Sequence, residues 1–174
     1  GDTLRGSAGA NAILGGTGND TIEGRAGADT LDGGDNTDTA SYENSTLGVT
    51  IDLTTVGAQG GAGDGAGDVL TNFENLTGSN QADTLRGDGL GNVLTGLDGS
   101  DVLEGRGGAD TLVGGGGTGA DTASYAGSTQ GVTVDLTLTG AQGGAGDAAG
   151  DVLSGIENPV SYTHLRAHET GRNL

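Results

Sequence analysis

The sequence of 174 residues has no cysteine, methionine or tryptophan, and only one proline, one phenylalanine and three tyrosines. Without cysteine, neither a disulfide framework nor a thiolate metal site can stabilise the chain. So few bulky side chains cannot form the core of an ordinary globular domain. No apolar run is long enough to cross a bilayer, so we expect no membrane insertion by this segment.

Glycine and acidic residues are abundant instead. The chain has 40 glycines, and 24 acidic residues against six basic ones give a net charge of −18. Such a chain repels itself and should not bind nucleic acid, but it attracts cations. Composition alone would predict disorder, because glycine loses more backbone entropy on folding than any other residue.

A nine-residue period opposes that expectation. In two stretches a glycine recurs every nine residues, with an aspartate or asparagine five places later and an aliphatic residue two places after that. The best copy, residues 15–23, reads GGTGNDTIE. An aliphatic side chain at a constant phase can stack into a narrow continuous core. The period therefore predicts a stacked repeat, with core residues that include Leu4, Ile22, Leu31, Leu85, Leu103 and Leu112.

The polar positions of this period suit a hard cation. Glycines allow sharp turns that direct carbonyl oxygens inward, and the aspartate adds a carboxylate. Oxygen ligands in a flexible turn favour Ca²⁺ over Mg²⁺, which requires strict octahedral geometry. Zn²⁺ is disfavoured because the chain has no cysteine and its two histidines lie near the C-terminus.

If one nonapeptide forms a turn and a strand, two form a full coil, and carboxylates eighteen residues apart meet at about 4.8 Å spacing. The expected pairs are Asp2 with Asp20, Asn11 with Asp29, Asp20 with Asp38, Asp83 with Asp101, Asn92 with Asp110, and a stretched pair of Asp101 with Asp121. Turn glycines complete the predicted metal set: Gly16, Gly18, Gly27, Gly99 and Gly108. Asn11 and Asn92 lack charge, so their sites should be weaker.

An aspartate beside glycine can also be a plain turn former that bonds its own backbone. A series in phase with both glycine and aliphatic residues favours metal binding. Six aspartates fall outside this phase and are expected to be solvated charges: Asp32, Asp35, Asp52, Asp88, Asp98 and Asp135.

These repeats resemble the calcium-binding nonapeptide of RTX, or hemolysin-type, proteins, whose pattern is G-G-x-G-x-D-x-U-x. The resemblance covers residues 1–47 and 78–125 most strongly. It implies an all-β fold, a parallel β-roll or right-handed β-helix-like solenoid, with Ca²⁺ in the Gly/Asp turns. It also implies a fragment of a larger protein that leaves a Gram-negative bacterium through a type I secretion apparatus.

A longer repeat overlies the short one. The sequence DTASY at residues 38–42 returns at 121–125, and GAQGGAGD at 57–64 returns at 140–147. We therefore predict two copies of one module, residues 1–82 and 83–158. Within them, residues 48–53 and 131–136 alternate apolar and polar side chains and are predicted to be half-buried strands. The nine-residue register is lost over 48–77 and 131–158, where Asp64, Asp68, Asp147 and Asp151 are candidates for irregular sites.

The C-terminal segment has a different composition. Residues 160–170 resemble the translation of a common sequencing adapter, so we interpret residues 159–174 as a non-native tail and exclude them from fold reasoning. A divergent natural linker is the alternative.

The sequence favours a calcium-binding structural module over an enzyme. Outside the tail it has no histidine, cysteine or lysine for acid–base or nucleophilic chemistry. We expect Ca²⁺-dependent folding of a secreted or cell-surface bacterial protein, as a spacer or adhesin-type module. The alternative is the C-terminal secretion and folding module of an RTX exoenzyme, a protease or a lipase, whose catalytic domain lies elsewhere.

Overall fold

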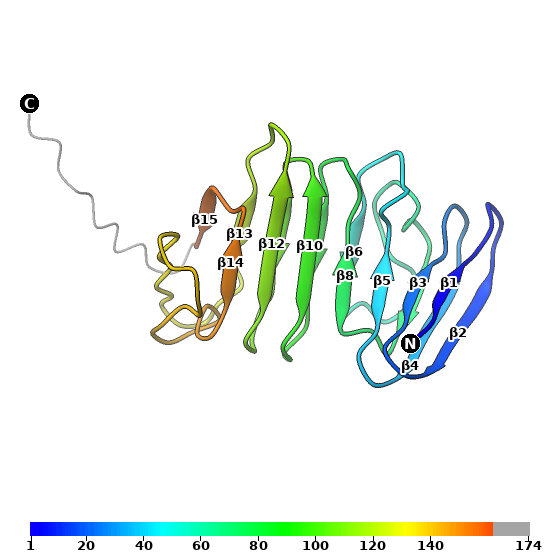
Figure 1. Ribbon diagram of the computed structural model, residues 1–174, viewed down its shortest axis with the longest axis horizontal. Helices are drawn as coiled ribbons and strands as arrows, with labels where there is room; N and C mark the ends of the chain where they lie inside the picture. Colours follow the sequence, from blue (N-terminus) through cyan, green and yellow to red (C-terminus); the bar gives the residue numbers. More distant parts are fainter. Residues whose placement is uncertain (162–174) are drawn as a thin grey trace, which may run out of the picture.

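The computed structural model describes residues 1–161, which form a parallel β-roll (Figure 1). All ladders between its fifteen strands are parallel, and residues 1–161 contain no helix. No helix in this part of the chain could therefore span a membrane. The expected all-β, parallel β-roll fold is confirmed. The part of the predicted tail beyond Ser161 lies outside the described residues.

One side of the roll is a seven-stranded sheet. Its strands, in spatial order, are β1 (Thr3–Arg5), β3 (Thr21–Glu23), β5 (Thr39–Ser41), β8 (Asn75–Thr77), β10 (Val93–Asp98), β12 (Thr111–Gly116) and β14 (Val152–Ser154). In Figure 1 they follow one another along the long axis, from blue to orange.

The chain alternates between this sheet and two smaller ones. The three-stranded sheet contains β2 (Ala12–Thr17), β4 (Thr30–Asp35) and β7 (Val69–Thr71). The five-stranded sheet contains β15 (Asn158–Val160), β13 (Thr122–Ser124), β11 (Val102–Glu104), β9 (Thr84–Arg86) and β6 (Thr50–Asp52), in that spatial order.

Strand register confirms the coil of eighteen residues. Leu4 lies opposite Ile22, and Leu94 lies opposite Leu112. Except in β15, whose central Pro159 is exposed, the aliphatic residue at the centre of each short strand points into the narrow space between the sheets. Ile22, Leu31, Leu85, Leu103 and Leu112 are fully buried, as expected, whereas Leu4 in the first coil is only partly buried.

The first insertion, between β5 and β8, places two successive strands on the same side of the roll. β7 pairs with β4, whereas β6 runs ahead and pairs with β9, and no ladder joins β6 to β7. The returning loop is fixed by Gln59, whose side chain accepts from the N–H of Asp52 and donates to its carbonyl, both at 3.0 Å.

This insertion changes the side on which the repeated sequence lies. Residues 2–6 and 83–87 both read DTLRG, yet β1 belongs to the seven-stranded sheet and β9 to the five-stranded one. Because β6 and β7 follow one another on the same side, every later strand lies on the side opposite to the one that the nine-residue alternation would give it. The predicted strand at 48–53 is present as β6, but residues 131–136 form no strand, and that prediction was wrong. β6 pairs with β9, and residues 1–161 supply no corresponding strand beside Thr133.

The turns make different demands on their glycines. Gly16 has a φ of +100°, and a Cβ built on it would meet no atom within 4 Å. Gly89 also has open space around it, but its φ lies outside the left-handed region. The two positions therefore separate backbone strain from steric crowding.

We expect Gly16→Ala to lower the free energy of unfolding by about 1 kcal/mol, because alanine is strained at positive φ. Gly89→Ala is the matched control and should be neutral or stabilising by about 0.5 kcal/mol, since it restricts only the unfolded chain. Thermal melts followed by circular dichroism in Ca²⁺ would measure both. Equal effects of the two substitutions would contradict the backbone explanation.

Candidate metal centre

The turn aspartates connect successive coils through a ladder of hydrogen bonds. In each step the backbone N–H of one turn residue donates to the carboxylate Oδ1 of the residue one coil later. The six predicted pairs all form this contact: Asp2 to Asp20 at 2.5 Å, Asn11 to Asp29 at 2.8 Å, Asp20 to Asp38 at 2.7 Å, Asp83 to Asp101 at 2.8 Å, Asn92 to Asp110 at 2.8 Å, and Asp101 to Asp121 at 2.9 Å.

The glycines proposed for the turns adopt the backbone that the sequence demanded. All five have left-handed φ angles: Gly16 at 100°, Gly18 at 113°, Gly27 at 138°, Gly99 at 150° and Gly108 at 121°. L-residues rarely adopt such angles, so these positions hold the chain in the sharp turn beside the carboxylates. Their role as ligands remains a proposal.

The glycine that opens each nonapeptide has a separate purpose. A Cβ on Gly96 would collide with Oδ2 of Asp101, and one on Gly105 would collide with Oδ2 of Asp110. Only a residue without a side chain lets the carboxylate fold back over the start of its own repeat. The first glycine therefore makes room for the acid five places later.

The second carboxylate oxygen has no partner. Oδ1 accepts the ladder hydrogen bond, but Oδ2 is buried without any hydrogen-bond partner in Asp20, Asp29, Asp38, Asp101 and Asp110. A buried oxygen that carries charge and lacks a partner is costly, and a bound cation would remove that cost. These oxygens therefore fit a metal ion.

Carboxylates alone do not build the site. Within residues 1–161, no three acidic or histidine side chains converge as a group that could hold a metal ion. The remaining ligands would therefore be backbone carbonyls of the glycine turns. A set dominated by carbonyl and carboxylate oxygens suits Ca²⁺ better than Zn²⁺.

Asn92 shows how the ladder is satisfied without charge. Its backbone N–H donates to Asp110, as in the other steps, and its Nδ2 donates to the carbonyl of Glu74 at 2.8 Å. The Asn92 side chain thus satisfies the Glu74 carbonyl with an N–H donor, where an aspartate would offer only acceptor oxygens. This contact supports the expectation that a cation binds more weakly at Asn92 than at an aspartate.

Burial changes the acidity of several carboxyls. Burial raises the pKa of Asp101 from 3.8 to about 7, although the N–H of Asp83 opposes the change. Burial likewise raises the pKa of Asp110 to about 7 and that of Asp68 to about 6. In the absence of a cation, the folded roll therefore binds protons that the unfolded chain releases.

Four acidic residues in the insertions extend the ladder. The backbone N–H of Asp29 donates to Oδ1 of Asp68, and that of Asp110 donates to Oδ1 of Asp151, both at 2.9 Å. The backbone N–H groups of Asp38 and Asp121 donate to the carboxylates of Glu74 and Glu157. Sequence reasoning gave Asp68 and Asp151 only as candidates for irregular sites and missed Glu74 and Glu157. A signal was present, because each of the four stands two places before the central residue of its strand, as Asp20 does before Ile22.

The tyrosines act on the same acids. Tyr42 and Tyr125 are fully buried in the core. The hydroxyl of Tyr42 donates to Oδ2 of Asp68 at 3.2 Å, and that of Tyr125 donates to Oδ2 of Asp151 at 2.9 Å. The second oxygen of these two aspartates therefore has a protein partner.

One aspartate expected to be a solvated charge has a different environment. Asp52 at the end of β6 forms a bidentate ion pair with Arg106, with N–O distances of 2.7 and 2.9 Å. Burial alone would raise the pKa of Asp52, but hydrogen bonds from Arg106 and Thr54 outweigh it and lower the pKa to about 2. This pair fastens the first insertion to a turn of the second repeat.

The comparison with protein families agrees with the geometry. A family model, the RTX calcium-binding nonapeptide repeat in four copies, matches residues 5–40 and 87–122. The chain carries RTX calcium-binding nonapeptide repeats. RTX repeats bind calcium ions, so the predicted cofactor, Ca²⁺, is confirmed. The residues that would hold it stay a prediction. No curated protein matches the chain.

The RTX matches coincide with the regular part of the ladder. Both matched segments stop close to the start of an insertion, at residues 40 and 122. In three RTX repeats the second place lacks glycine but keeps a left-handed backbone at a cost, with φ of 64° at Arg25, 82° at Leu97 and 68° at Arg106. At these three places the left-handed turn is thus retained although its preferred residue is absent.

The raised pKa values predict how the metal-free roll responds to pH. Protonation of Asp101 and Asp110 favours the folded state, so its stability should be highest near pH 4 and fall as the pH rises to about 7. Ca²⁺ competes with these protons, so its affinity should increase through the same window.

Far-UV circular dichroism of the metal-free chain across this pH range would measure the effect. The β signal should decrease toward neutral pH and return on addition of Ca²⁺. A metal-free signal that rises with pH would show that these carboxyls do not control folding.

Proposed function

We propose that this chain is a calcium-dependent folding module of a secreted or cell-surface bacterial protein. The observation that carries the proposal is the set of five buried aspartates whose Oδ2 has no partner. In the ladder, each of these acids already binds the backbone one coil earlier. The same carboxylate therefore holds two coils together through Oδ1 and leaves a buried charge at Oδ2 for a cation to neutralise.

This linkage makes calcium a folding switch. With a net charge of −18, the metal-free chain repels itself and must also bury carboxylates. Ca²⁺ neutralises the turns, and its binding free energy becomes folding free energy because the unfolded chain has no preformed site. Extracellular calcium modules bind with Kd of about 10⁻⁴–10⁻³ M, which matches external but not cytosolic calcium.

Such a switch suits export by a type I secretion apparatus. The chain would remain unfolded and transportable in the low-calcium cytosol and would fold outside the cell. The 83-residue internal repeat favours a spacer or adhesin-type module of a long surface protein. RTX repeats are a calcium-binding structural module rather than a catalytic one, so in the alternative, an RTX exoenzyme, the protease or lipase chemistry would lie in another part of the protein.

Asp101→Asn tests the proposal. Loss of the charge should weaken calcium binding by roughly tenfold and raise the calcium concentration at the folding midpoint. The same change should stabilise the metal-free fold, because it removes a buried charge. Calcium titrations followed by circular dichroism would measure both effects.

Asp35→Asn is the matched control, since it removes the same charge from an exposed position outside the ladder. It should leave the midpoint nearly unchanged. A wild-type spectrum that does not respond to calcium would refute the proposed function, and equal shifts in the two variants would refute the role of Asp101.

A further inference from the structure

The eight nonapeptides of the two regular stretches differ in the backbone at their second place. In five of them this residue has a left-handed φ: Gly16, Arg25, Gly34, Leu97 and Arg106. In the other three, the φ of the second residue lies outside the left-handed region: Ser7, Ser79 and Asp88. This difference divides the polar residues of the ladder into the same two groups.

The left-handed turns leave their acids open. These acids stand four places after the left-handed residue: Asp20, Asp29, Asp38, Asp101 and Asp110. In each of them Oδ1 accepts the ladder N–H, and Oδ2 is buried without a hydrogen-bond partner. A turn of this kind therefore has an unmet demand for a cation.

The remaining turns close on themselves. The backbone N–H of Ser7 donates to Oδ1 of Asn11 at 2.6 Å, and that of Asp88 donates to Oδ1 of Asn92 at 2.8 Å. Because φ sets the direction in which a residue's own N–H points, the two backbones direct the second-place N–H differently. The closed turn thus supplies from its own backbone the donor that an open turn lacks.

Asp83 shows that charge does not separate the two kinds of turn. Its Oδ2 accepts the N–H of Ser79 at 2.5 Å, and its Oδ1 accepts the Ser79 hydroxyl and the N–H of Val49, at 2.9 and 2.7 Å. Asp83 is buried like Asp101, yet both of its oxygens have partners. Hydrogen bonds from three donors stabilise a carboxylate without a metal ion.

Short polar side chains hold the closed turns. Oγ of Ser79 accepts from the N–H of Gln81 at 3.1 Å, and Oδ1 of Asp88 accepts from the N–H of Leu90 at 2.7 Å. Ser7 makes the same contact at 3.4 Å. Serine and aspartate commonly bond to the backbone two residues on, whereas glycine, leucine and arginine have no acceptor for it. The residue type at the second place therefore selects the turn.

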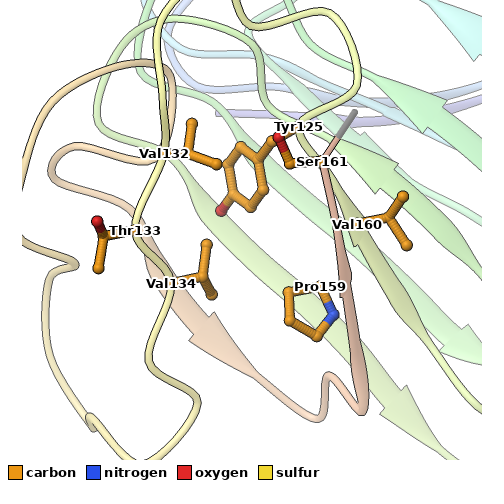
Figure 2. A pocket seen from close by; sticks show the side chains of 7 residues that line it. All are labelled: Tyr125, Val132, Thr133, Val134, Pro159, Val160 and Ser161. Carbon is orange, nitrogen blue, oxygen red and sulfur yellow. The ribbon is translucent and has the colours of Figure 1, made fainter. Parts of the chain in front are cut away.

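The acids of the insertions are closed by another donor. In the second insertion the hydroxyl of Tyr125 donates to Oδ2 of Asp151 at 2.9 Å. Figure 2 shows Tyr125 beside Val132 and Val134, which line a pocket with it and pack against the core. Tyr42 closes the corresponding acid of the first insertion. A protein donor thus takes the second carboxylate oxygen in two different settings in this roll.

We propose that the residue at the second place decides which turns of the roll bind calcium. Turns with glycine, leucine or arginine there are open and bind Ca²⁺ at their acid, whereas turns with serine or aspartate are closed and bind none. The inference rests on the proposed calcium-dependent folding and assigns its sites. Calcium binds at the five open acids and does not bind at Asp83, although that residue is charged.

The closed turns of the second stretch adjoin the first insertion. Asp83 accepts from the N–H of Val49, and Nδ2 of Asn92 donates to the carbonyl of Glu74. Val49 and Glu74 both belong to the insertion between β5 and β8. Protein donors therefore hold this joint, and calcium binds in the coils on either side of it.

Substitutions of Arg25 test the assignment, because its turn is open and it lies outside the strands. Arg25→Ser supplies the acceptor that closes the turn over Asp29. Arg25→Gly is the matched control, since it removes the same charge but keeps the left-handed turn. In equilibrium dialysis against millimolar radioactive calcium, Arg25→Ser should bind about one ion fewer per chain than Arg25→Gly, which should bind as many as the wild type.

Ser79→Gly is the reverse test. It removes the acceptor for the N–H of Gln81 and permits a left-handed backbone, so the turn opens over an acid that already carries the charge. The variant should bind about one ion more per chain than the wild type. Circular dichroism of the same samples shows whether each variant has folded.

The outcomes separate this inference from the calcium switch. A wild-type spectrum that does not respond to calcium would refute the proposed function and this inference together. Equal calcium counts in folded Arg25→Ser and Arg25→Gly, or a wild-type count in folded Ser79→Gly, would overturn the role of the second place and leave the calcium switch intact.

Discussion

The roll depends on a single contact that recurs in every coil, the hydrogen bond from a turn N–H to the carboxylate one coil later. This bond fixes the spacing of the coils and satisfies a backbone donor that would otherwise be buried without a partner. It also determines where the second carboxylate oxygen lies. Because Oδ1 is occupied by the backbone, Oδ2 is left inside the turn with charge and no partner. The contact that builds the fold thereby creates the demand for a cation.

Glycine serves this contact in two distinct ways. The first glycine of a repeat leaves space for the carboxylate, as at Gly96, where any side chain would strike Asp101. The second place is less constrained, because Leu97 occupies it with a left-handed φ of 82° whereas Ser79 and Asp88 occupy it outside the left-handed region. Steric exclusion is absolute, whereas a left-handed φ costs only about 1–2 kcal/mol. The second place can therefore vary, while the first is glycine in every nonapeptide of the two regular stretches.

The regular part of the roll could be predicted from the sequence because local period and global stacking coincide there. One nonapeptide supplies one strand, so Asp2, Asp20 and Asp38 align without any knowledge of distant contacts. The ladder also continues where the period fails, through Asp68 and Glu74, because an acid still stands two places before the strand centre.

The insertions could not be derived in the same way. β6 pairs with a strand that follows it by more than thirty residues, in the order Thr50 to Thr84, and no local pattern encodes that partner. The same limit explains the wrong expectation for residues 131–136. Alternation of Val132, Thr133 and Val134 describes a surface suited to a neighbour, and a strand forms only where the neighbour exists.

The insertions also show that the two sides of the roll are equivalent. β1 and β9 share a sequence but lie on opposite sides, and each keeps the same partners one coil later: Asp20 and Asp101 for the turn, Glu23 and Glu104 for the arginine. A side chain in this fold therefore responds to the coil before and after it rather than to the sheet that contains it. Since each repeat carries its own tyrosine, glutamine and acids for the insertion, it brings its complete junction with it. A half-coil change of side thus leaves the carboxylate ladder, the arginine–glutamate pair and the glutamine clamp of the next repeat intact.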